Sequence, residues 1–267
     1  MTDLTALTQR HAQVWSNGPF EEVADTIADV HVALVEALRP QPGERWLDLA
    51  TGAGSVAELA AAAGATVTGI DLSPRLVEVA RARARAGGYD IEYEVGDCQN
   101  LAGVADGAYD VVSSCVGIIF APDHGATARE LARVTRPGGR IGVAAWTREG
   151  GVGRMFEMMA PFSPPPPEGA GSPFGWGDEE HVTALLGDAF ELRFERKVST
   201  YHAQSGRACW ELFASAYGPT KTLAESLDPE RREALAEAWS TFFDTEYEAP
   251  GGIAHDREYL LVIGARR

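Results

Sequence analysis

The sequence has few cysteines and no long apolar runs. Its three cysteines, Cys98, Cys115 and Cys209, lie far apart and lack the paired spacing of a disulfide framework or a zinc site. We therefore expect free thiols, a cytoplasmic location and no bound metal. No apolar stretch approaches the roughly 18 residues needed to span a bilayer. The first residues also lack the basic and apolar regions of a secretory signal, so we expect no membrane association.

Positive charge is also scarce. The chain has 23 Lys and Arg against 39 Asp and Glu, which gives a net charge of -16. Such a charge repels phosphate backbones and anionic membrane surfaces over about 8 Å or more. We therefore expect a small molecule, and neither nucleic acid nor a membrane, as the partner. The sequence does not distinguish a monomer from a homodimer.

The spacing of apolar residues divides the 267 residues into three segments. Residues 1–42 show helical spacing from residue 3 to residue 38 and end at two prolines, which predicts a helical N-terminal cap. In residues 43–147, short apolar runs alternate with helix-length segments. This alternation predicts an α/β fold, with βαβ units stacked into a parallel sheet and helices on both faces.

The third segment, residues 148–267, breaks this rhythm. It opens with a stretch rich in glycine and proline, residues 148–177, which predicts structure that is irregular and surface-lying at least in part. The later pattern predicts helices at 178–187, 206–216 and 229–246, and strands at 189–203 and 258–267. We expect these two strands to extend the edge of the same sheet.

A glycine-containing turn follows the first strand. The strand runs into Asp48-Leu49-Ala50-Thr51-Gly52-Ala53-Gly54, and an alanine-rich helix comes next. Glycines at such a turn let the backbone approach a ligand closely, and the start of the helix offers unpaired N–H groups. The turn therefore predicts a nucleotide-type site, and it also satisfies the dinucleotide pattern G-x-G-x-x-G/A.

Three acidic residues fall at the ends of three consecutive strands. Asp71 ends the second strand, where a carboxylate can accept both ribose hydroxyls of a bound nucleoside. Asp48 would repel the pyrophosphate of a dinucleotide, and Asp97 adds a further acid after the third strand. The group favours a cationic cofactor, S-adenosylmethionine, over a nicotinamide dinucleotide. An NAD-dependent oxidoreductase remains the less favoured alternative.

Residues 43–146 resemble class I S-adenosylmethionine-dependent methyltransferases, in particular the small-molecule group that includes the ubiquinone and menaquinone biosynthesis enzymes. The matching pieces are PGERWLDLATGAG, VTGIDLSPRLVEVAR, VGDCQNL, YDVVSSCVGIIFAPD and RVTRPGGRIGVAAW. The resemblance implies a Rossmann-like, doubly wound, mostly parallel seven-stranded sheet with an antiparallel last strand, and a helical insertion over the substrate. It also implies methyl transfer that leaves S-adenosylhomocysteine as the product.

The resemblance also implies roles for particular residues. The loop from Asp48 to Gly54 would hold the methionine part, with Ala50, Thr51 and Gly52 between them. Asp71 would bind the ribose, Leu72 would lie beside the adenine, and Gly96, Asp97 and Cys98 would flank the adenine edge. Ser114 would lie near the methyl group, and Trp15 would close over the cofactor. Ala50 replaces a glycine that is common in the family, a mild substitution that we expect binding to survive.

The acceptor is less well specified. Ser114-Cys115-Val116-Gly117 stands where enzymes that methylate base or amide nitrogens carry an Asn/Asp-Pro-Pro-aromatic tetrad, which argues against such substrates. The third segment is rich in methionine and aromatic residues, which favours a small apolar or aromatic acceptor. These residues are Met155, Phe156, Met158, Met159, Phe162, Phe174, Trp176, Trp210, Phe213 and Tyr217.

No catalytic residue is assigned by the sequence. His124 and His181 are candidate bases, but a helix entry and an exposed helical position explain them more simply, and Cys115 is more simply a small core residue. Positioning alone can supply roughly 7 to 11 kcal/mol of a barrier, so a base is optional. A protein that binds S-adenosylmethionine without transferring its methyl group is the second alternative.

Overall fold

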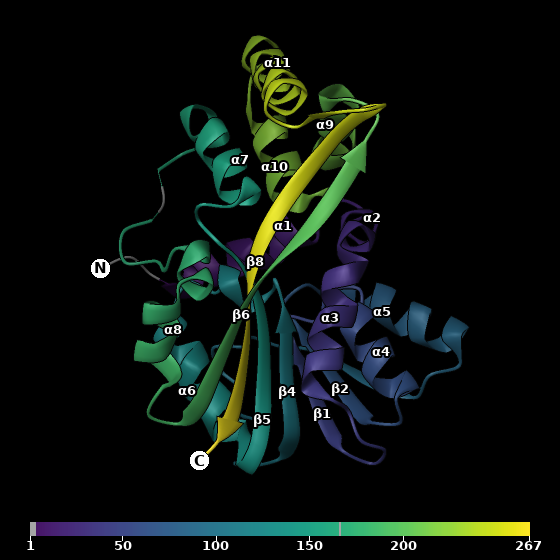
Figure 1. Ribbon diagram of the computed structural model, residues 1–267, viewed down its shortest axis with the longest axis vertical. Helices are drawn as coiled ribbons and strands as arrows, with labels where there is room; N and C mark the ends of the chain where they lie inside the picture. Colours follow the sequence, from purple (N-terminus) through teal and green to yellow (C-terminus); the bar gives the residue numbers. More distant parts are fainter. Residues whose placement is uncertain (1–3, 166) are drawn as a thin grey trace.

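The computed structural model describes residues 4–165 and 167–267, so residues 1–3 of the predicted N-terminal cap lie outside the described residues. The strands are β1 Arg45–Leu49, β2 Thr66–Asp71, β3 Ile91–Val95, β4 Tyr109–Cys115, β5 Thr135–Trp146, β6 Phe190–Ala203, β7 Glu248–Ala249 and β8 Gly252–Arg266. They form one sheet in the order β3-β2-β1-β4-β5-β8-β6, with β7 paired to β8 (Figure 1).

Strand directions confirm the predicted topology. Strands β1 to β5 run parallel to one another, and β8 pairs antiparallel with both β5 and β6. The seven long strands therefore make a mostly parallel sheet with an antiparallel last strand. β7 adds a two-residue pairing that was not predicted.

Helices cover both faces of the sheet. They are α1 Leu4–Trp15, α2 Glu21–Ala24, α3 Ala28–Leu38, α4 Ser55–Ala62, α5 Pro74–Gly87, α6 His124–Val134, α7 Gly151–Met159, α8 Glu179–Leu186, α9 Gly206–Ala216, α10 Gly218–Ser226 and α11 Pro229–Glu246. Helices α3, α4 and α5 lie on one face, and α6 and α8 lie on the other (Figure 1). This is the doubly wound arrangement that the alternating pattern predicts.

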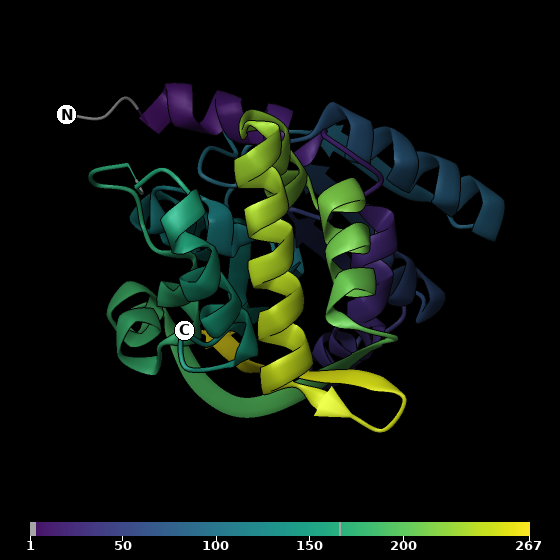
Figure 2. The ribbon, with the colours of Figure 1, turned by 90° about the horizontal axis from the view of Figure 1, so that it is seen from above.

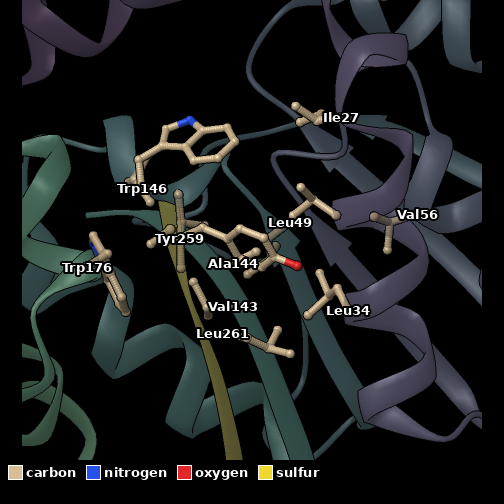
Figure 3. Packing of buried hydrophobic residues seen from close by; sticks show 14 of the residues in the cluster. Ile27, Leu34, Leu49, Val56, Val143, Ala144, Trp146, Trp176, Tyr259 and Leu261 are labelled. Atoms are coloured by element: carbon tan, nitrogen blue, oxygen red, sulfur yellow. The ribbon is translucent and has the colours of Figure 1, made fainter. Parts of the chain in front are cut away.

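Helix α3 belongs to the body of the fold, although it comes from the segment predicted as a cap. Its Leu34 and Leu38 are fully buried, and a Cβ at Gly142 of β5 would lie within 2.8 Å of both side chains. The missing side chain at Gly142 therefore lets α3 approach the sheet closely. Leu34 faces Ala144 of β5 and Leu261 of β8 in the core (Figure 3).

Strands β6 and β8 continue past the end of β5. The last β5–β8 pair joins Trp146 to Tyr259, whereas β6 pairs with β8 down to Ile253. This projecting ribbon reaches the helices above the sheet (Figure 1). Seen from above, α11 crosses the molecule between α7 and α9, and it contacts both (Figure 2).

The stretch 148–177 was predicted to be irregular and surface-lying at least in part, and its first part instead forms the helix α7. The glycines that suggested a loop serve helix packing instead. A Cβ at Gly151 would lie 2.3 Å from the Asp256 carbonyl oxygen of β8, and one at Gly153 would lie 1.8 Å from the Arg148 carbonyl oxygen. The missing Cβ at Gly151 lets α7 lie directly against the projecting part of β8, and the missing Cβ at Gly153 leaves room for the turn at Arg148 before the helix. Helix α10 is a further helix that the sequence pattern did not indicate.

Candidate functional site

A large cavity lies over the carboxyl ends of the parallel strands, where ligands of open α/β sheets bind. The space inside it, counted together with the solvent at its open side, is about 1370 Å³. Its wall combines strand ends (Asp48, Asp71, Cys115, Trp146) with residues from α1, α3, α7, α9 and β8. The cavity therefore extends from the strand ends to the helices that cover them.

Asp48 is buried at the end of β1 and is held by hydroxyl groups. Its carboxylate accepts hydrogen bonds from Thr51 Oγ1 (2.6 Å) and Ser113 Oγ (2.7 Å), and Trp46 Nε1 donates to Ser113 Oγ in turn. Burial, together with a smaller contribution from the nearby Asp71 charge, raises the pKa of Asp48 from 3.8 to about 6, although the two hydroxyl hydrogen bonds oppose the rise. A cationic ligand would offset both effects, so the site favours positive charge.

Asp71 is buried at the end of β2, with both carboxylate oxygens held by backbone groups. Gly52 N donates to Oδ2 and Ser73 N donates to Oδ1, each at 2.8 Å. Burial raises the pKa of Asp71, and these two hydrogen bonds oppose the rise. The two N–H donors fix the carboxylate, whose remaining lone pairs can accept further hydrogen bonds.

Gln99 joins the third acidic residue to its surroundings and was not singled out from the sequence. Its amide Nε2 donates to both oxygens of Asp97, at 3.0 and 3.1 Å, and to Thr8 Oγ1 of α1 at 3.2 Å. Its Oε1 accepts from Asp123 N at the start of α6. Gln99, Asp97 and Cys98 all line the cavity, and burial raises the pKa of the Cys98 thiol to about 12.

The turn after β1 adopts left-handed backbone conformations. Gly52 has φ +56°, as suits a glycine, but Ala50 also has φ +50°. This conformation costs an alanine roughly 1–2 kcal/mol, so the replacement of the common glycine stores some strain. Ala50, Thr51 and Gly52 line the cavity, as do Leu72 and Gly96.

Two of the predicted site residues lie behind the cavity wall. Gly54 begins α4 with φ +87°, and a Cβ there would lie 2.4 Å from Tyr93 Oη, so it serves packing against β3. Ser114 is fully buried, and its Oγ accepts from Ile118 N at 3.1 Å. Successive residues of a strand alternate faces, and Cys115, the residue after Ser114, lines the cavity instead.

Trp15 lines the cavity at the end of α1. Its ring contacts Phe20 at a centroid distance of 5.3 Å, Phe120 at 4.9 Å and Tyr217 at 5.6 Å. These four residues come from three distant parts of the chain. Their aromatic cluster ties the N-terminal segment to the third segment across the cavity.

The other end of the cavity is largely apolar. Of the ten methionine and aromatic residues predicted to shape it, Met155, Phe213 and Tyr217 line the wall. The others lie outside the cavity wall, as with Phe156 against Phe174 at 5.3 Å and Trp210 against Trp239 at 5.7 Å. Val23, Ile27 and Val152 complete the apolar wall with Trp146.

Three buried polar residues of the cavity wall were missed by sequence reasoning. His31, His255 and Arg257 line the cavity. Burial lowers the pKa of each histidine from 6.5 to about 4, so both are neutral at pH 7. His255 Nε2 is buried without a hydrogen-bond partner among the described residues. The spacing of these residues could have identified two of them. His255, Arg257 and Tyr259 are two residues apart, so on a strand they lie on the same face, and in β8 that face is the buried one.

The histidines chosen from the sequence lie elsewhere. His124 Nδ1 and His181 Nε2 are 3.0 Å apart and bind each other, and neither lines the cavity. Asp123 caps α6 just before His124, as expected of a helix entry. Cys115 does line the cavity, but burial raises the pKa of its thiol well above 9, which makes it a poor nucleophile at neutral pH.

Residues 4–165 and 167–267 offer neither a metal site nor a membrane span. Those residues contain no group of three His, Cys, Asp or Glu side chains able to hold a metal ion. None of the helices formed by the same residues is long and apolar enough to cross a membrane.

Known proteins resemble the chain in sequence and in structure. A family model described as a methyltransferase domain matches residues 47–143. An uncharacterized protein of Mycobacterium tuberculosis is 39% identical over 274 residues, covering 98% of this chain and 96% of the relative. A ubiquinone biosynthesis O-methyltransferase of Xanthomonas axonopodis pv. citri is 32% identical over 133 residues, covering 50% and 55%. The YcgJ protein of Bacillus subtilis has a similar structure, with a TM-score of 0.63 at 18% identity, covering 90% of this chain and 98% of that one.

These likenesses agree with the buried carboxylates at the strand ends. The family model covers residues 47–143, and the mycobacterial relative covers almost the whole chain. They favour the methyltransferase hypothesis over the nicotinamide alternative. The chain belongs to the family of its mycobacterial relative, and it is a class I S-adenosylmethionine-dependent methyltransferase.

Proposed function

We propose that this enzyme methylates a small molecule that is largely apolar or aromatic. One observation carries the proposal: a single cavity joins the three acidic strand ends to the apolar wall of Met155, Phe213 and Val152. Two ligands that share this cavity would meet near the end of β4. The acceptor would then lie against apolar side chains, which also keep water from the reacting atoms.

The acidic end is the part that suits the cofactor. Asp71 would accept the ribose hydroxyls, and the turn from Asp48 to Gly52 would hold the methionine part. Leu72, Asp97 and Cys98 would surround the adenine, and Trp15 would cover the bound molecule. Gly54 and Ser114 would support the site from behind. We extend the assignment to Gln99, because it fixes Asp97 and contacts α1.

The reaction needs mainly position. When bound, S-adenosylmethionine supplies an electrophilic methyl group. The cavity wall would hold the acceptor atom in line with the methyl carbon and its bond to sulfur, and such alignment supplies roughly 7 to 11 kcal/mol. His255 lies on the same wall, but its Nε2 is buried against Gly151 of α7, so it would act by holding α7 and β8 in place around the acceptor.

The test is a screen with a defined set of acceptors. Phenols, aromatic acids, aromatic amines, aromatic thiols, sugars and free amino acids would be incubated with S-adenosylmethionine labelled in the methyl group. We expect label to enter an apolar or aromatic member, with formation of S-adenosylhomocysteine. Transfer to sugars or polar amino acids alone, or no transfer despite tight cofactor binding, would contradict the proposal.

A pair of variants links this result to the cavity. Phe213→Ala enlarges the apolar wall and should raise the KM of the acceptor at least severalfold while the cofactor affinity stays unchanged. Phe242→Ala is the matched control, because Phe242 packs against Phe243 and Tyr247 outside the cavity. Equal effects of the two substitutions would indicate that Phe213 acts through stability alone.

A further inference from the structure

Arg257 places a charged group in the apolar end of the cavity. It lies on the projecting part of β8, two residues beyond the last pair with β5, and only 3% of it is exposed. Its guanidinium carbon lies 5.8 Å from the centre of the Trp146 ring and 5.4 Å from that of Tyr201. A buried arginine on a cavity wall is costly unless another group compensates its charge.

The hydrogen bonds of Arg257 do not neutralise it. Nη1 donates to Thr26 Oγ1 at 3.0 Å, Nη2 donates to the Thr26 carbonyl and to Ser199 Oγ, and Nε donates to the Ser199 carbonyl. All these acceptors are neutral. One Nη1 proton has no partner among the described residues, and Asp29 is reached only through Ser199 Oγ.

Arg257 nevertheless stays charged at neutral pH. Burial lowers its pKa from 12.5 to about 10, and the Asp29 carboxylate opposes part of this fall. The neighbouring His255 is neutral at pH 7, and the Arg257 charge contributes to its lowered pKa. The apolar end of the cavity therefore holds one positive charge with a free donor.

Arg257 lies several strands away from the cofactor end of the cavity. Strand β8 is three strands away from β1 in the sheet order, which corresponds to about 14 Å at the usual strand spacing. It is two strands from β4, or about 10 Å. Arg257 would therefore face the part of the acceptor that lies away from the methylated atom.

We propose that Arg257 binds an anionic oxygen group of the acceptor, so that the substrate is an aromatic or apolar acid anchored at the end remote from the methyl group. The proposal rests on the proposed function. It reconciles an apolar wall with a buried cation: the hydrocarbon part lies against Met155, Val152 and Phe213, and the acid compensates Arg257. Arginine suits the task because its planar fork matches a carboxylate.

The test compares matched acids and amides. Benzoate, phenylacetate, 3-phenylpropanoate and 2-naphthoate, each beside its primary carboxamide, would be titrated into protein saturated with S-adenosylhomocysteine and followed by saturation-transfer NMR. We expect at least one acid to bind tenfold or more tightly than its amide. Arg257→Gln should remove this preference and leave amide binding within about twofold. If no acid binds better than its amide in the wild type, or if the preference survives in Arg257→Gln, the proposal is wrong.

Two further variants separate binding from folding. Arg196→Gln makes the same charge change at an exposed position of β6 and should keep the preference for acids. Arg257→Lys keeps the charge without the fork and should keep part of the preference, which is informative if Arg257→Gln is poorly folded.

The cofactor carboxylate is the competing partner for Arg257. Titration with S-adenosylhomocysteine and with methylthioadenosine, which lacks the amino acid part, distinguishes the two. We expect Arg257→Gln to leave both affinities unchanged. A selective loss of S-adenosylhomocysteine binding would assign Arg257 to the cofactor and overturn the proposal. Failure of the wild type to bind S-adenosylhomocysteine at all would instead count against the proposed function.

Discussion

The two ends of the cavity are assembled from different kinds of chain segment. The acidic end uses the carboxyl ends of β1, β2 and β3 and the turns that follow them, all within residues 48–99. The apolar end uses side chains from the N-terminal helices, from α7 and α9, and from β8. The first and the last of these elements are more than two hundred residues apart in sequence. The acidic end is therefore formed by one continuous sequence motif, whereas the apolar end forms only when distant segments of the chain fold together.

The two ends also differ in the sign of the charge that they bury. Asp71 and Asp48 are buried anions whose carboxylates are held by backbone N–H and hydroxyl donors. Arg257 is a buried cation whose protein partners are all neutral. In a chain with a net charge of -16, this cation would give the acceptor end a local preference for anions that the overall charge conceals.

The largest expected effect is at the cofactor end. Asp71→Asn should weaken binding of S-adenosylmethionine and S-adenosylhomocysteine at least about 100-fold, because two charge-assisted hydrogen bonds are worth about 1.5–3 kcal/mol each. Calorimetric titration would measure it. Phe213→Ala, at the other end, should leave both affinities unchanged. Similar losses in the two variants would show that the ends are not independent.

A second effect concerns the free protein. The pKa of Asp48 is raised from 3.8 to about 6 in the folded state, so its contribution to stability is present below about pH 4 and is lost as the pH rises through 6. This difference corresponds to about 3 kcal/mol. Asp48→Asn should therefore raise the free energy of unfolding by up to that amount at pH 8 and leave it nearly unchanged at pH 4.

Urea unfolding of both proteins without cofactor, at the two pH values, would check this prediction. The gain is an upper limit, because the amide offers one oxygen to the Thr51 and Ser113 hydroxyls, which now donate to two. A variant that is less stable than the wild type at pH 8 would mean that these hydrogen bonds outweigh the cost of burying the charge.

Because the pKa of Asp48 is raised to about 6, we also expect cofactor binding to depend on pH. A bound cation lowers the pKa of Asp48, so binding should tighten as the pH rises through about 6 and be about tenfold weaker at pH 5 than at pH 7. Titrations in two buffers of different ionisation enthalpy would detect the released proton. The dependence should vanish in Asp48→Asn. Equal wild-type affinity at pH 5 and pH 7 would show that cofactor binding does not change the pKa of Asp48.

Much of the acidic end could be predicted from sequence because each of its elements is local. A strand, a glycine turn and a helix follow one another in the chain, and parallel strands bring Asp48, Asp71 and Asp97 to one edge of the sheet. The details of that edge could not be predicted. The side toward which Ser114 turns depends on the start of the turn at Ile118, and the role of Gly54 depends on Tyr93 of another strand.

The acceptor end was mostly missed for a physical reason. The last strand was predicted at 258–267, but β8 begins at Gly252, and the extra residues carry His255 and Arg257. Polar residues at buried positions break the apolar pattern that marks a strand. A clue was the length of the other late strand: β6 has 14 residues and needs a partner of similar length to satisfy its backbone groups.

The smallest expected effect belongs to the histidine pair that sequence reasoning had offered as a base. Burial lowers the pKa of His124 from 6.5 to about 4, so the folded state disfavours its charged form. Its contribution to stability is present above pH 6.5 and is lost as the pH falls toward 4. His124→Gln should therefore reduce the loss of stability in acid, while cofactor affinity and methyl transfer at pH 7.5 stay within about twofold. His255→Gln is the informative contrast, since it alters a group on the cavity wall that packs against α7 and should lower turnover severalfold by disturbing that wall. If His124→Gln lowered turnover as much as His255→Gln does, the histidine pair would affect methyl transfer as much as the cavity wall does. The conclusion that the pair only supports α6 would then be wrong.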